Sequence, residues 1–501
     1  MSNQPTVPTT VVIPTIGRPS LIALLGALGA TSGPRPAQLI VVDDSASDSR
    51  SAGLQAGLPK GTTLLRSGGR GPAAARNLGW RAARTPWVSF LDDDVLPDPD
   101  WLARLATDIS AAADDVVGIQ GRLRVPLPKH RRPTDWERST AGLATATWIT
   151  ADMTYRRSAL SAAGGFDERF PRAYREDSDL ALRVVTGGGQ IVPGQRASTH
   201  PVRPAGPWAS LRQQAGNADD VLMRRLHGRR WRQRVSAPPG RISRHTAITA
   251  TGLGAMLAVA VGRRRLSAAC ALGAGAGVLE FALARIAPGP RNRQEVTRMV
   301  LTSLIIPPAA VWHRVVGLWR HRTAAPWRGL PDLVLFDRDG TLVHDVPYNG
   351  DPELARVMPG AHSALERLRA SGVRVGMVTN QSGVGSGRIT PAQVEAVNDR
   401  VSALLGPFDV IETCLHAADA GCGCRKPAPG MIQRACDILD LAPARCIVVG
   451  DIGSDVAAAQ AAGAVGVLVP TSATRPAEIE QAPLIEPDLT SAADRILAGA
   501  W

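Results

Sequence analysis

Two carboxylates, Asp337 and Asp339, stand one residue apart directly after the apolar run Leu333 to Phe336. The run predicts a buried strand, and because side chains alternate along a strand, both acids would reach the same side of its carboxyl end. Gly340 then allows the chain to turn away. Two acids in such a position repel each other unless a cation lies between them, which favours a Mg²⁺ site with one Asp free to act as a nucleophile. A solvated Asp turn after a strand accounts for the same spacing.

Later polar residues favour the reactive interpretation. Thr379 and Asn380 follow the apolar run that begins at Val375, and their hydroxyl and amide groups suit a phosphate oxygen. Arg425 and Lys426 supply positive charge, and a third apolar run, from Cys446, is followed by Asp451 and Asp455. Lysine occurs only at positions 60, 129 and 426 of this arginine-rich chain, which suggests that a compact ammonium group is needed at 426.

In this order, the motifs resemble those of the haloacid dehalogenase (HAD) superfamily, over about residues 331–501. The stretch is similar to the small phosphatases that act on histidinol phosphate and on heptose 1,7-bisphosphate. The resemblance implies that Asp337 attacks phosphorus and that Asp339 protonates the leaving oxygen and then activates water. It implies that the phosphoryl group is bound by Thr379, Asn380, Arg425 and Lys426. It also implies a Mg²⁺ site on Asp337, Asp339 and Asp451, and support of Lys426 by Asp455. Ile452 stands where the heptose phosphatases usually carry Lys, which leaves the substrate open.

Three thiols and one imidazole precede Arg425: Cys414, His416, Cys422 and Cys424. Their number and softness suit a closed tetrahedral Zn²⁺ site. They resemble the zinc loop of the same phosphatases, with a shorter stretch between His416 and Cys422, and the implied role is to fix the loop that carries Arg425 and Lys426. Free cysteines beside a surface histidine are the alternative. Six cysteines in the chain do not indicate a disulfide framework, so we expect a reducing compartment.

The N-terminal part holds a second series of strands followed by acids. Apolar runs end at Pro14 and Thr15, at Asp43 and Asp44, and at the triplet Asp92, Asp93 and Asp94. A glycine-rich loop opens a helix near Arg76. Strands that alternate with helices predict an α/β sheet with its site at the strand ends, where an acid triplet suits a divalent ion on a diphosphate. The triplet could instead simply begin a turn.

Residues 8–230 resemble family 2 glycosyltransferases with the GT-A fold. The resemblance rests on Val-Ile-Pro-Thr, Val-Val-Asp-Asp-Ser, Ala-Arg-Asn-Leu-Gly, Leu-Asp-Asp-Asp, Gly-Gly-Phe-Asp-Glu and Arg-Glu-Asp. It implies a nucleotide pocket that is lined by Pro14, Thr15, Arg76 and either Asp43 or Asp44. It also implies that Asp92, Asp93 and Asp94 bind Mg²⁺ or Mn²⁺. Asp177 would deprotonate the acceptor hydroxyl in an inverting transfer. No Gln-x-x-Arg-Trp pattern follows Asp177, which favours single addition over polymerisation. Residues 120–150 and 195–215 give no acceptor signal.

Between these parts lie an arginine cluster and three apolar stretches. The cluster is Arg224, Arg225, Arg229, Arg230, Arg232, Arg234, Arg241 and Arg244, and the stretches are 246–262, 266–279 and 299–311. The third contains Pro307 and Pro308 and is followed by His313 and Arg314, and Arg263 to Arg265 lie between the first two. We expect two membrane spans or re-entrant helices beside an anionic lipid surface, although a hairpin would place the Arg triplet against the positive-inside tendency. A soluble helical linker and a nucleic-acid-binding cluster are the alternatives.

The sequence thus predicts three α/β or helical parts: a GT-A domain at 1–235, an apolar helical segment at 236–325 and a HAD domain with a zinc loop at 326–501. The net charge of +13 and the 4% of aromatic residues favour an anionic partner other than nucleic acid. The polar N-terminus lacks a signal-peptide pattern, so a cytoplasmic location at the inner membrane face is expected.

The interpretation is a bifunctional enzyme: a Mg²⁺-dependent sugar-phosphate phosphatase and a nucleotide-sugar-dependent transferase for a glycan or a lipid-linked acceptor of the cell envelope. One rival is a histidinol-phosphate phosphatase in an incidental fusion. The other is a silent HAD module that positions the transferase.

Overall fold

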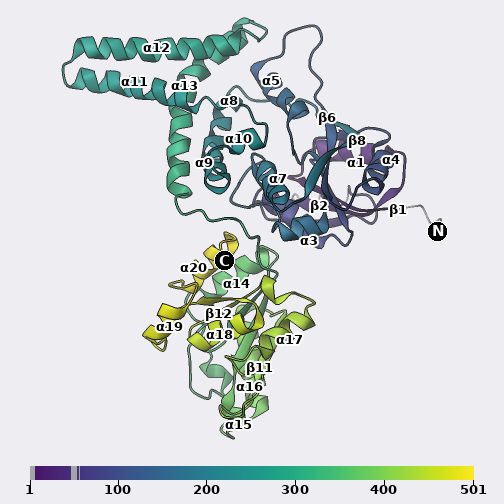
Figure 1. Ribbon diagram of the computed structural model, residues 1–501, viewed down its shortest axis with the longest axis vertical. Helices are drawn as coiled ribbons and strands as arrows, with labels where there is room; N and C mark the ends of the chain where they lie inside the picture. The colour runs from purple at the N-terminus through teal and green to yellow at the C-terminus, as the bar shows by residue number, and fades with distance from the viewer. Residues whose placement is uncertain (1–5, 47–53, 56) are drawn as a thin grey trace. The chain divides into compact units, whose positions relative to one another are not determined.

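The computed structural model describes residues 6–46, 54–55 and 57–501, in two compact units, Met1–Ala325 and Pro326–Trp501. Residues 1–5 of the polar N-terminal segment, for which no secretory signal is predicted, lie outside the described residues. Figure 1 shows a sheet in each unit, and between these sheets along the chain a run of helices that belongs to the first unit.

The first unit contains a mixed sheet with the strand order β3-β2-β1-β4-β7-β6-β8-β5. The strands are β1 (Thr6–Thr15), β2 (Arg35–Asp43), β3 (Thr63–Arg66), β4 (Trp87–Leu91), β5 (Leu96–Pro97), β6 (Val116–Arg124), β7 (Asp152–Arg156) and β8 (Gln190–Thr199). The first four in chain order pair in parallel, whereas β7 is antiparallel to β4 and β6. The predicted α/β class with strand ends at one edge is confirmed for this part.

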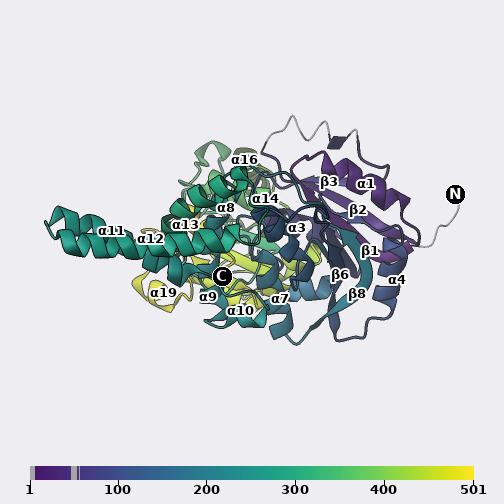
Figure 2. The same cartoon turned by 90° about the horizontal axis from the view of Figure 1, so that it is seen from above.

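Helices cover both faces of this sheet (Figure 2). One core packs α1 (Ser20–Ala30) and α4 (Trp101–Ser110) on one face, and the other packs α3 (Pro72–Ala82), α6 (Arg157–Ala162) and α7 (Glu176–Thr186) on the opposite face. Burial on both faces explains why β1 reads as a continuous apolar run at Val11 to Ile13. Gly79 lets α3 approach β1, because a Cβ there would lie 2.3 Å from Val12 Cγ1.

Three long helices follow the sheet of the first unit: α11 (Ile242–Ala260), α12 (Arg264–Ile286) and α13 (Arg293–Arg320). Shorter helices complete the unit: α5 (Asp135–Ala141), α8 (Ala209–Arg212), α9 (Gly216–His227) and α10 (Trp231–Arg234). Among the described residues, α12 and α13 are long and apolar enough to cross a membrane, by length and composition. The predicted apolar helical segment is therefore confirmed as helical.

The helix that contains the third apolar stretch extends beyond both of its ends. Helix α13 continues through Pro307 and Pro308 to Arg320. Prolines inside a helix cost about 3 kcal/mol or more because they remove hydrogen bonds. Here the face with Met299, Ile306 and Ala310 is buried, so tertiary packing outweighs that cost.

The second unit is a five-stranded parallel sheet with the order β11-β10-β9-β12-β13. The strands are β9 (Leu333–Asp337), β10 (Arg374–Asn380), β11 (Val410–Cys414), β12 (Cys446–Gly450) and β13 (Val465–Leu468). Helices α14 (Ala361–Ala370), α16 (Pro391–Leu405) and α20 (Leu489–Leu497) pack on one face, and α17 (Gly430–Ile438) and α18 (Gly453–Ala462) on the other. Helices α15 (Ser382–Gly385) and α19 (Pro476–Gln481) complete the unit. The apolar runs singled out in the sequence are its three central strands.

Candidate active sites

The first candidate site lies at the carboxyl edge of the second sheet. Strand β9 pairs in parallel with β10 and β12, so Asp337, Thr379 and Asp451 come to one edge although they are far apart in sequence. All three side chains are buried. The parallel register therefore assembles these predicted residues.

Lys426 is the buried cation of this site. Its Nζ lies 2.5 Å from Asp337 Oδ1 and 2.6 Å from Asp455 Oδ1, and it donates to the carbonyl of Val378 at 3.2 Å. Burial opposes the charge on Lys426, but the two carboxylates outweigh it and raise the pKa of the lysine. A permanently charged ammonium is thus fixed beside Asp337.

Asn380, predicted to bind substrate, instead holds the backbone of Lys426. Its Nδ2 donates to the Lys426 carbonyl and its Oδ1 accepts from the Lys426 N–H, both at 3.1 Å. An amide is needed for this pair of bonds, because a carboxylate only accepts. Asn380 therefore positions Lys426, and we expect its effect on substrate to be indirect.

The three buried carboxylates that converge are Asp337, Asp451 and Asp455, whose ligand atoms lie within 4.8 Å of one another. One ammonium leaves this trio with an excess of negative charge, and burial and repulsion from Asp455 raise the pKa of Asp451 to about 6. Gly340 brings the loop after β9 against this trio, since a Cβ there would lie 2.2 Å from Asp451 Oδ2. Crowded hard oxygen ligands of this kind fit a divalent cation such as Mg²⁺.

Asp339, predicted as a third ligand, is not in that group. Its carboxylate accepts from Arg338 at 3.0 and 3.1 Å and from Gln381 Nε2 at 2.8 Å. Strand β9 ends at Asp337, so the alternation of a strand does not extend to Asp339, and Mg²⁺ binding by Asp339 stays a prediction. The structure groups Asp455 with the other two acids in its place.

Sequence reasoning missed Gln381 and Arg338. Gln381 Nε2 also donates to Thr379 Oγ1 at 2.8 Å, so one amide links the predicted general acid Asp339 to a predicted phosphoryl-binding hydroxyl. Arg338 is buried and donates to Asn398 Oδ1 at 2.8 Å. A buried arginine between two acids in Asp-Arg-Asp was the available signal for this network.

The predicted zinc ligands lie together at the end of β11. Cys424 Sγ is 3.4 Å from the sulfurs of Cys414 and Cys422 and 3.2 Å from His416 Nδ1. Ligands of a tetrahedral site with Zn–S bonds of about 2.3 Å lie about 3.8 Å apart, so a small expansion would accommodate the ion. Because Arg425 and Lys426 follow at once, the cluster sits where it can fix the loop that carries them.

Replacing Cys424 by Ser is expected to remove the zinc and to lower the temperature at which phosphatase activity is lost by more than about 5 °C, because a lost structural metal costs several kcal/mol. Zinc content by mass spectrometry and thermal inactivation of the full chain measure the two effects. Cys270→Ser, outside the cluster, is the matched control. Equal zinc content in both variants would contradict the assignment.

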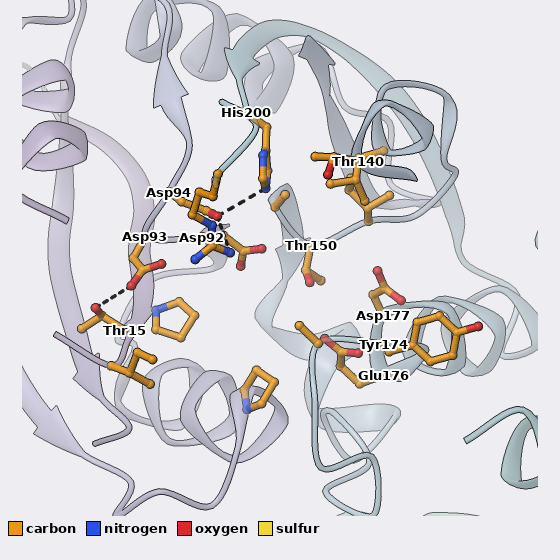
Figure 3. Close-up of a pocket in the computed structure, with 18 of the residues that line it drawn as sticks. Thr15, Asp92, Asp93, Asp94, Thr140, Thr150, Tyr174, Glu176, Asp177 and His200 are labelled. Carbon is orange, nitrogen blue, oxygen red and sulfur yellow. Dashed lines mark hydrogen bonds and ion pairs between the residues drawn. The ribbon is translucent and has the colours of Figure 1, made fainter. Parts of the chain in front are cut away.

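The second candidate site is a cavity of about 530 Å³ at the carboxyl edge of the first sheet (Figure 3). Pro14, Thr15 and Asp44 line it from the strand ends, and Asp177 lines it from the start of α7. Asp43 is fully buried, and its carboxylate accepts from the backbone and hydroxyl of Ser45 at 2.8 and 3.0 Å. Of the two acids proposed for the base or ribose, Asp44 is the one that faces the cavity.

The acid triplet does not converge on one point, contrary to the expectation of a single metal site on all three. Asp93 is buried and accepts from Thr15 Oγ1 at 2.7 Å and from Arg18 at 2.9 Å. Asp94 faces His200 Nε2 at 3.5 Å and Arg203 at 2.7 Å, and Asp92 accepts from Arg76 at 2.7 Å. Three consecutive side chains after a strand diverge, and Asp94 is repelled more strongly by Asp92 than by Asp93.

Arg76, predicted near the nucleotide, is a buried cation of this site. It donates to Glu176 Oε1 at 2.8 Å as well as to Asp92, and these carboxylates raise its pKa against the effect of burial. The ion pair links the acid triplet on one side of the cavity to the start of α7, which carries Asp177. Sequence reasoning assigned no role to Glu176.

Replacing Arg76 by Met is expected to destabilise the first unit by about 3–5 kcal/mol, because it leaves the buried Glu176 carboxylate and the partly exposed Asp92 carboxylate without their cation. Hydrogen exchange of α3 and β4 in denaturant measures the loss. Arg84→Met, at an exposed arginine just beyond α3, is the control and should change little. Equal exchange in the two variants would show that the ion pair contributes no stability.

Asp177 faces the cavity from the first turn of α7 (Figure 3). Its Oδ1 accepts from the Ser178 backbone at 2.6 Å, and burial raises the pKa of the carboxyl. Residues that sequence reasoning missed complete the lining: Trp136, Ser139 and Thr140 on α5, with His200 and Arg203 after β8. The Trp136 indole donates to the Arg203 carbonyl at 2.8 Å, so these two segments support each other.

Comparisons with known proteins match a different family to each of the two units. The model of Glycosyl transferase family 2 matches residues 10–171, and that of the HAD-hydrolase-like family matches residues 423–496. A D-glycero-beta-D-manno-heptose-1,7-bisphosphate 7-phosphatase from Pseudomonas putida is 37% identical over 144 residues, which are 28% of this chain and 82% of that protein. The protein of the same name from Escherichia coli K12 is 33% identical over 175 residues, 33% of this chain and 87% of that protein.

A solved structure of D,D-heptose 1,7-bisphosphate phosphatase from B. bronchiseptica, complexed with magnesium and phosphate, is 31% identical. The likeness covers 33% of this chain and 98% of that one, with a TM-score of 0.31.

Proposed function

We propose that this chain hydrolyses a sugar bisphosphate and transfers an activated sugar. Its C-terminal unit belongs to the heptose-bisphosphate phosphatase family of HAD hydrolases, and its N-terminal unit belongs to glycosyltransferase family 2. The chain is both a phosphatase and a glycosyltransferase. The substrates, metals and acceptor are the proposal. The observation that carries it is the buried group of Asp337, Lys426, Asp451 and Asp455.

In the phosphatase half, Asp337 attacks phosphorus, the bond to the leaving oxygen breaks, and an aspartyl-phosphate forms. Asp339 gives its proton to the leaving oxygen and then takes one from the water that hydrolyses the intermediate. Gln381 orients Asp339 and Thr379 together, and Lys426 compensates negative charge on the phosphoryl oxygens. Bound Mg²⁺ on Asp337, Asp451 and Asp455 would supply further charge neutralisation, which phosphoryl transfer chiefly requires.

A sugar bisphosphate of the heptose type is the proposed substrate, because the relatives named above carry that activity in their names. Phosphate release by the full chain with Mg²⁺ on heptose 1,7-bisphosphate, histidinol phosphate and hexose phosphates tests it. A preference for the bisphosphate supports the proposal. A preference for histidinol phosphate would replace the substrate and keep the reaction, and no turnover by zinc-loaded protein would favour a silent module.

In the transferase half, the proposed reaction is a single inverting transfer from a nucleotide sugar. Asp44, Pro14 and Thr15 line the end of the cavity suited to the nucleotide, and Asp92 with Asp94 would hold Mg²⁺ or Mn²⁺ at the diphosphate. Asp177 takes the proton of the acceptor hydroxyl as the oxygen attacks the anomeric carbon and the nucleoside diphosphate leaves. Arg76 pairs with Asp92 and with Glu176, the neighbour of Asp177. It thereby fixes the distance between the proposed metal site and the proposed general base.

The two halves are proposed to act on one supply of sugar. The phosphatase would leave a sugar 1-phosphate, which a separate nucleotidyl transfer must activate before the transferase can use it. Isotope-labelled bisphosphate fed to cells that express the chain should therefore appear in a nucleotide sugar. If the label never enters any nucleotide-sugar pool, the two activities are unconnected.

Asp451→Asn is expected to stabilise the protein without added Mg²⁺ at pH 7, while it abolishes phosphatase activity. The folded-state pKa of Asp451 is about 6, above its ordinary value, so the ionised acid destabilises the fold progressively as the pH rises from about 4 to 6. Removing this charge should recover about 3 kcal/mol. Thermal unfolding with and without Mg²⁺ measures it. A lower melting temperature than wild type in the metal-free protein would contradict the predicted excess of negative charge.

A further inference from the structure

The hairpin formed by α11 and α12 exposes apolar side chains along its length. Within their unit the two helices lie side by side and project away from the sheet (Figures 1 and 2). Leu257 is 68% and Leu272 75% exposed. The other large exposed apolar side chains on these helices are Leu253, Met256, Val259, Leu266, Leu279 and Leu283, with Val261 at the turn. An apolar surface of this extent requires a partner.

The charges on the hairpin are confined to its two ends. Residues 246–262 and 266–279 contain no charged side chain, a length of about 21–26 Å at 1.5 Å per residue. Arg263 to Arg265 form the tip, and their long side chains can extend toward lipid phosphates. This profile matches a hydrocarbon core of about 30 Å between two headgroup layers. A protein partner would not require an uncharged middle with arginines at the far end.

The base of the hairpin carries more arginines than the tip. Arg241 and Arg244 pair with Glu280 there, at 2.7 and 3.0 Å. The preceding segment adds Arg224, Arg225, Arg229, Arg230, Arg232 and Arg234. The arginine excess thus lies on the side of the catalytic sheet, which removes the conflict with the positive-inside tendency and suits an anionic cytoplasmic leaflet.

Arg285, buried at the base of α12, joins the hairpin to the transferase cavity. It donates to Thr302 and Ser303 of α13 at 2.8 and 3.1 Å and to Asp135 of α5 at 2.8 Å. The Arg285 carbonyl accepts from Arg138 of the same short helix at 2.9 Å. Since α5 also carries Trp136, Ser139 and Thr140, one wall of the cavity rests on the base of the hairpin.

We propose that the α11–α12 hairpin inserts into an anionic bilayer and that Arg285 thereby holds the α5 wall of the cavity at the lipid surface. The acceptor hydroxyl then reaches Asp177 from an amphiphile carried by that bilayer. The acceptor class rests on the proposed transferase function, whereas insertion and the role of Arg285 as a positioning residue do not.

Flotation of the full chain with vesicles tests insertion. Wild type is expected to float with phosphatidylcholine vesicles that contain phosphatidylglycerol. The double variant Leu257→Asp, Leu272→Asp should float at least about tenfold less, because acids in the hydrocarbon core are costly. Ile438→Asp, an equally exposed apolar position in the second unit, is the control and should float as wild type. Hydrogen exchange of the first sheet reports folding of the hairpin variant, whose substitutions lie in the first unit, and phosphate release reports folding of the Ile438→Asp control in the second unit.

Two results would overturn insertion. If 0.5 M salt releases wild type completely and the hairpin variants float normally, the contact is electrostatic adsorption alone. If wild type does not float but forms a dimer that the hairpin variants lack, in sedimentation experiments, the apolar surface binds a second copy.

Hydrogen exchange of residues 135–141 in the vesicle-bound chain tests the coupling. Arg285→Gln is expected to float as wild type but to exchange at least about tenfold faster in α5, and Arg285→Lys to recover part of the protection. Unchanged exchange in Arg285→Gln would overturn the positioning role. Donor sugar recovered only in water-soluble products, and never in vesicle lipids, would overturn the acceptor class while leaving the transferase activity standing.

Discussion

Replacing Asp337 by Asn is expected to lower phosphate release by at least about 10³-fold, the loss typical of removing a covalent nucleophile. The amide cannot attack phosphorus, and it no longer attracts the Lys426 ammonium that lies 2.5 Å from Oδ1 in the wild type. The measurement is phosphate release by the full chain with Mg²⁺ on the sugar bisphosphate.

Asp399→Asn, at an exposed acid of α16, controls for the loss of one negative charge and should leave the rate unchanged. Transferase activity should be the same in all three proteins. An Asp337→Asn variant that keeps more than about a tenth of the wild-type rate would exclude Asp337 as the nucleophile, because no covalent intermediate can form on an amide.

Replacing Asp177 by Asn is expected to lower sugar transfer by about 10²–10⁴-fold, the usual contribution of a general base. Nucleotide-sugar binding, measured by calorimetry, should persist, since Asp44, Pro14 and Thr15 line the opposite end of the cavity. Burial raises the pKa of Asp177, so wild-type transfer should also decline on the acid side at a pH above the ordinary range of an aspartate.

The matched control is Asp114→Asn, at an exposed position before β6. It should transfer at the wild-type rate, as should phosphate release in both variants. If Asp177→Asn lost donor binding to the same extent as transfer, Asp177 would be a binding residue, and another group would have to accept the proton.

The sequence predicted the strands and the edge at which they end because burial on both faces produces uninterrupted apolar runs. The run Leu333 to Phe336 and the run before Asp451 are visible by composition alone. The families were recognisable for the same reason: their motifs stand at strand ends. The cluster of Cys414, His416, Cys422 and Cys424 was predicted because cysteines at such spacing are rare outside metal sites, and the structure brings these residues together.

The direction of individual side chains could not be predicted, because it depends on where a strand stops. Asp339 and the triplet of Asp92 to Asp94 lie beyond the last residue of their strands, so neither alternation nor proximity in sequence fixes what they face. Gln381, Glu176 and His200 each contact a site residue that is distant in the chain: Asp339, Arg76 and Asp94, respectively. The link between Arg285 and Asp135 joins residues 150 positions apart and leaves no sequence pattern.

Cys414, the last residue of β11, belongs to two structures. It is buried in a hydrophobic core of the second unit, and it is one of the four cluster residues that precede Lys426. The transferase half shares none of these residues. The predicted zinc site therefore implies that, under zinc starvation, a newly made chain would retain sugar transfer while its phosphatase matured slowly. The ratio of the two activities in a cell would follow the supply of a trace nutrient, although both active sites are encoded by one gene and made in equal amounts.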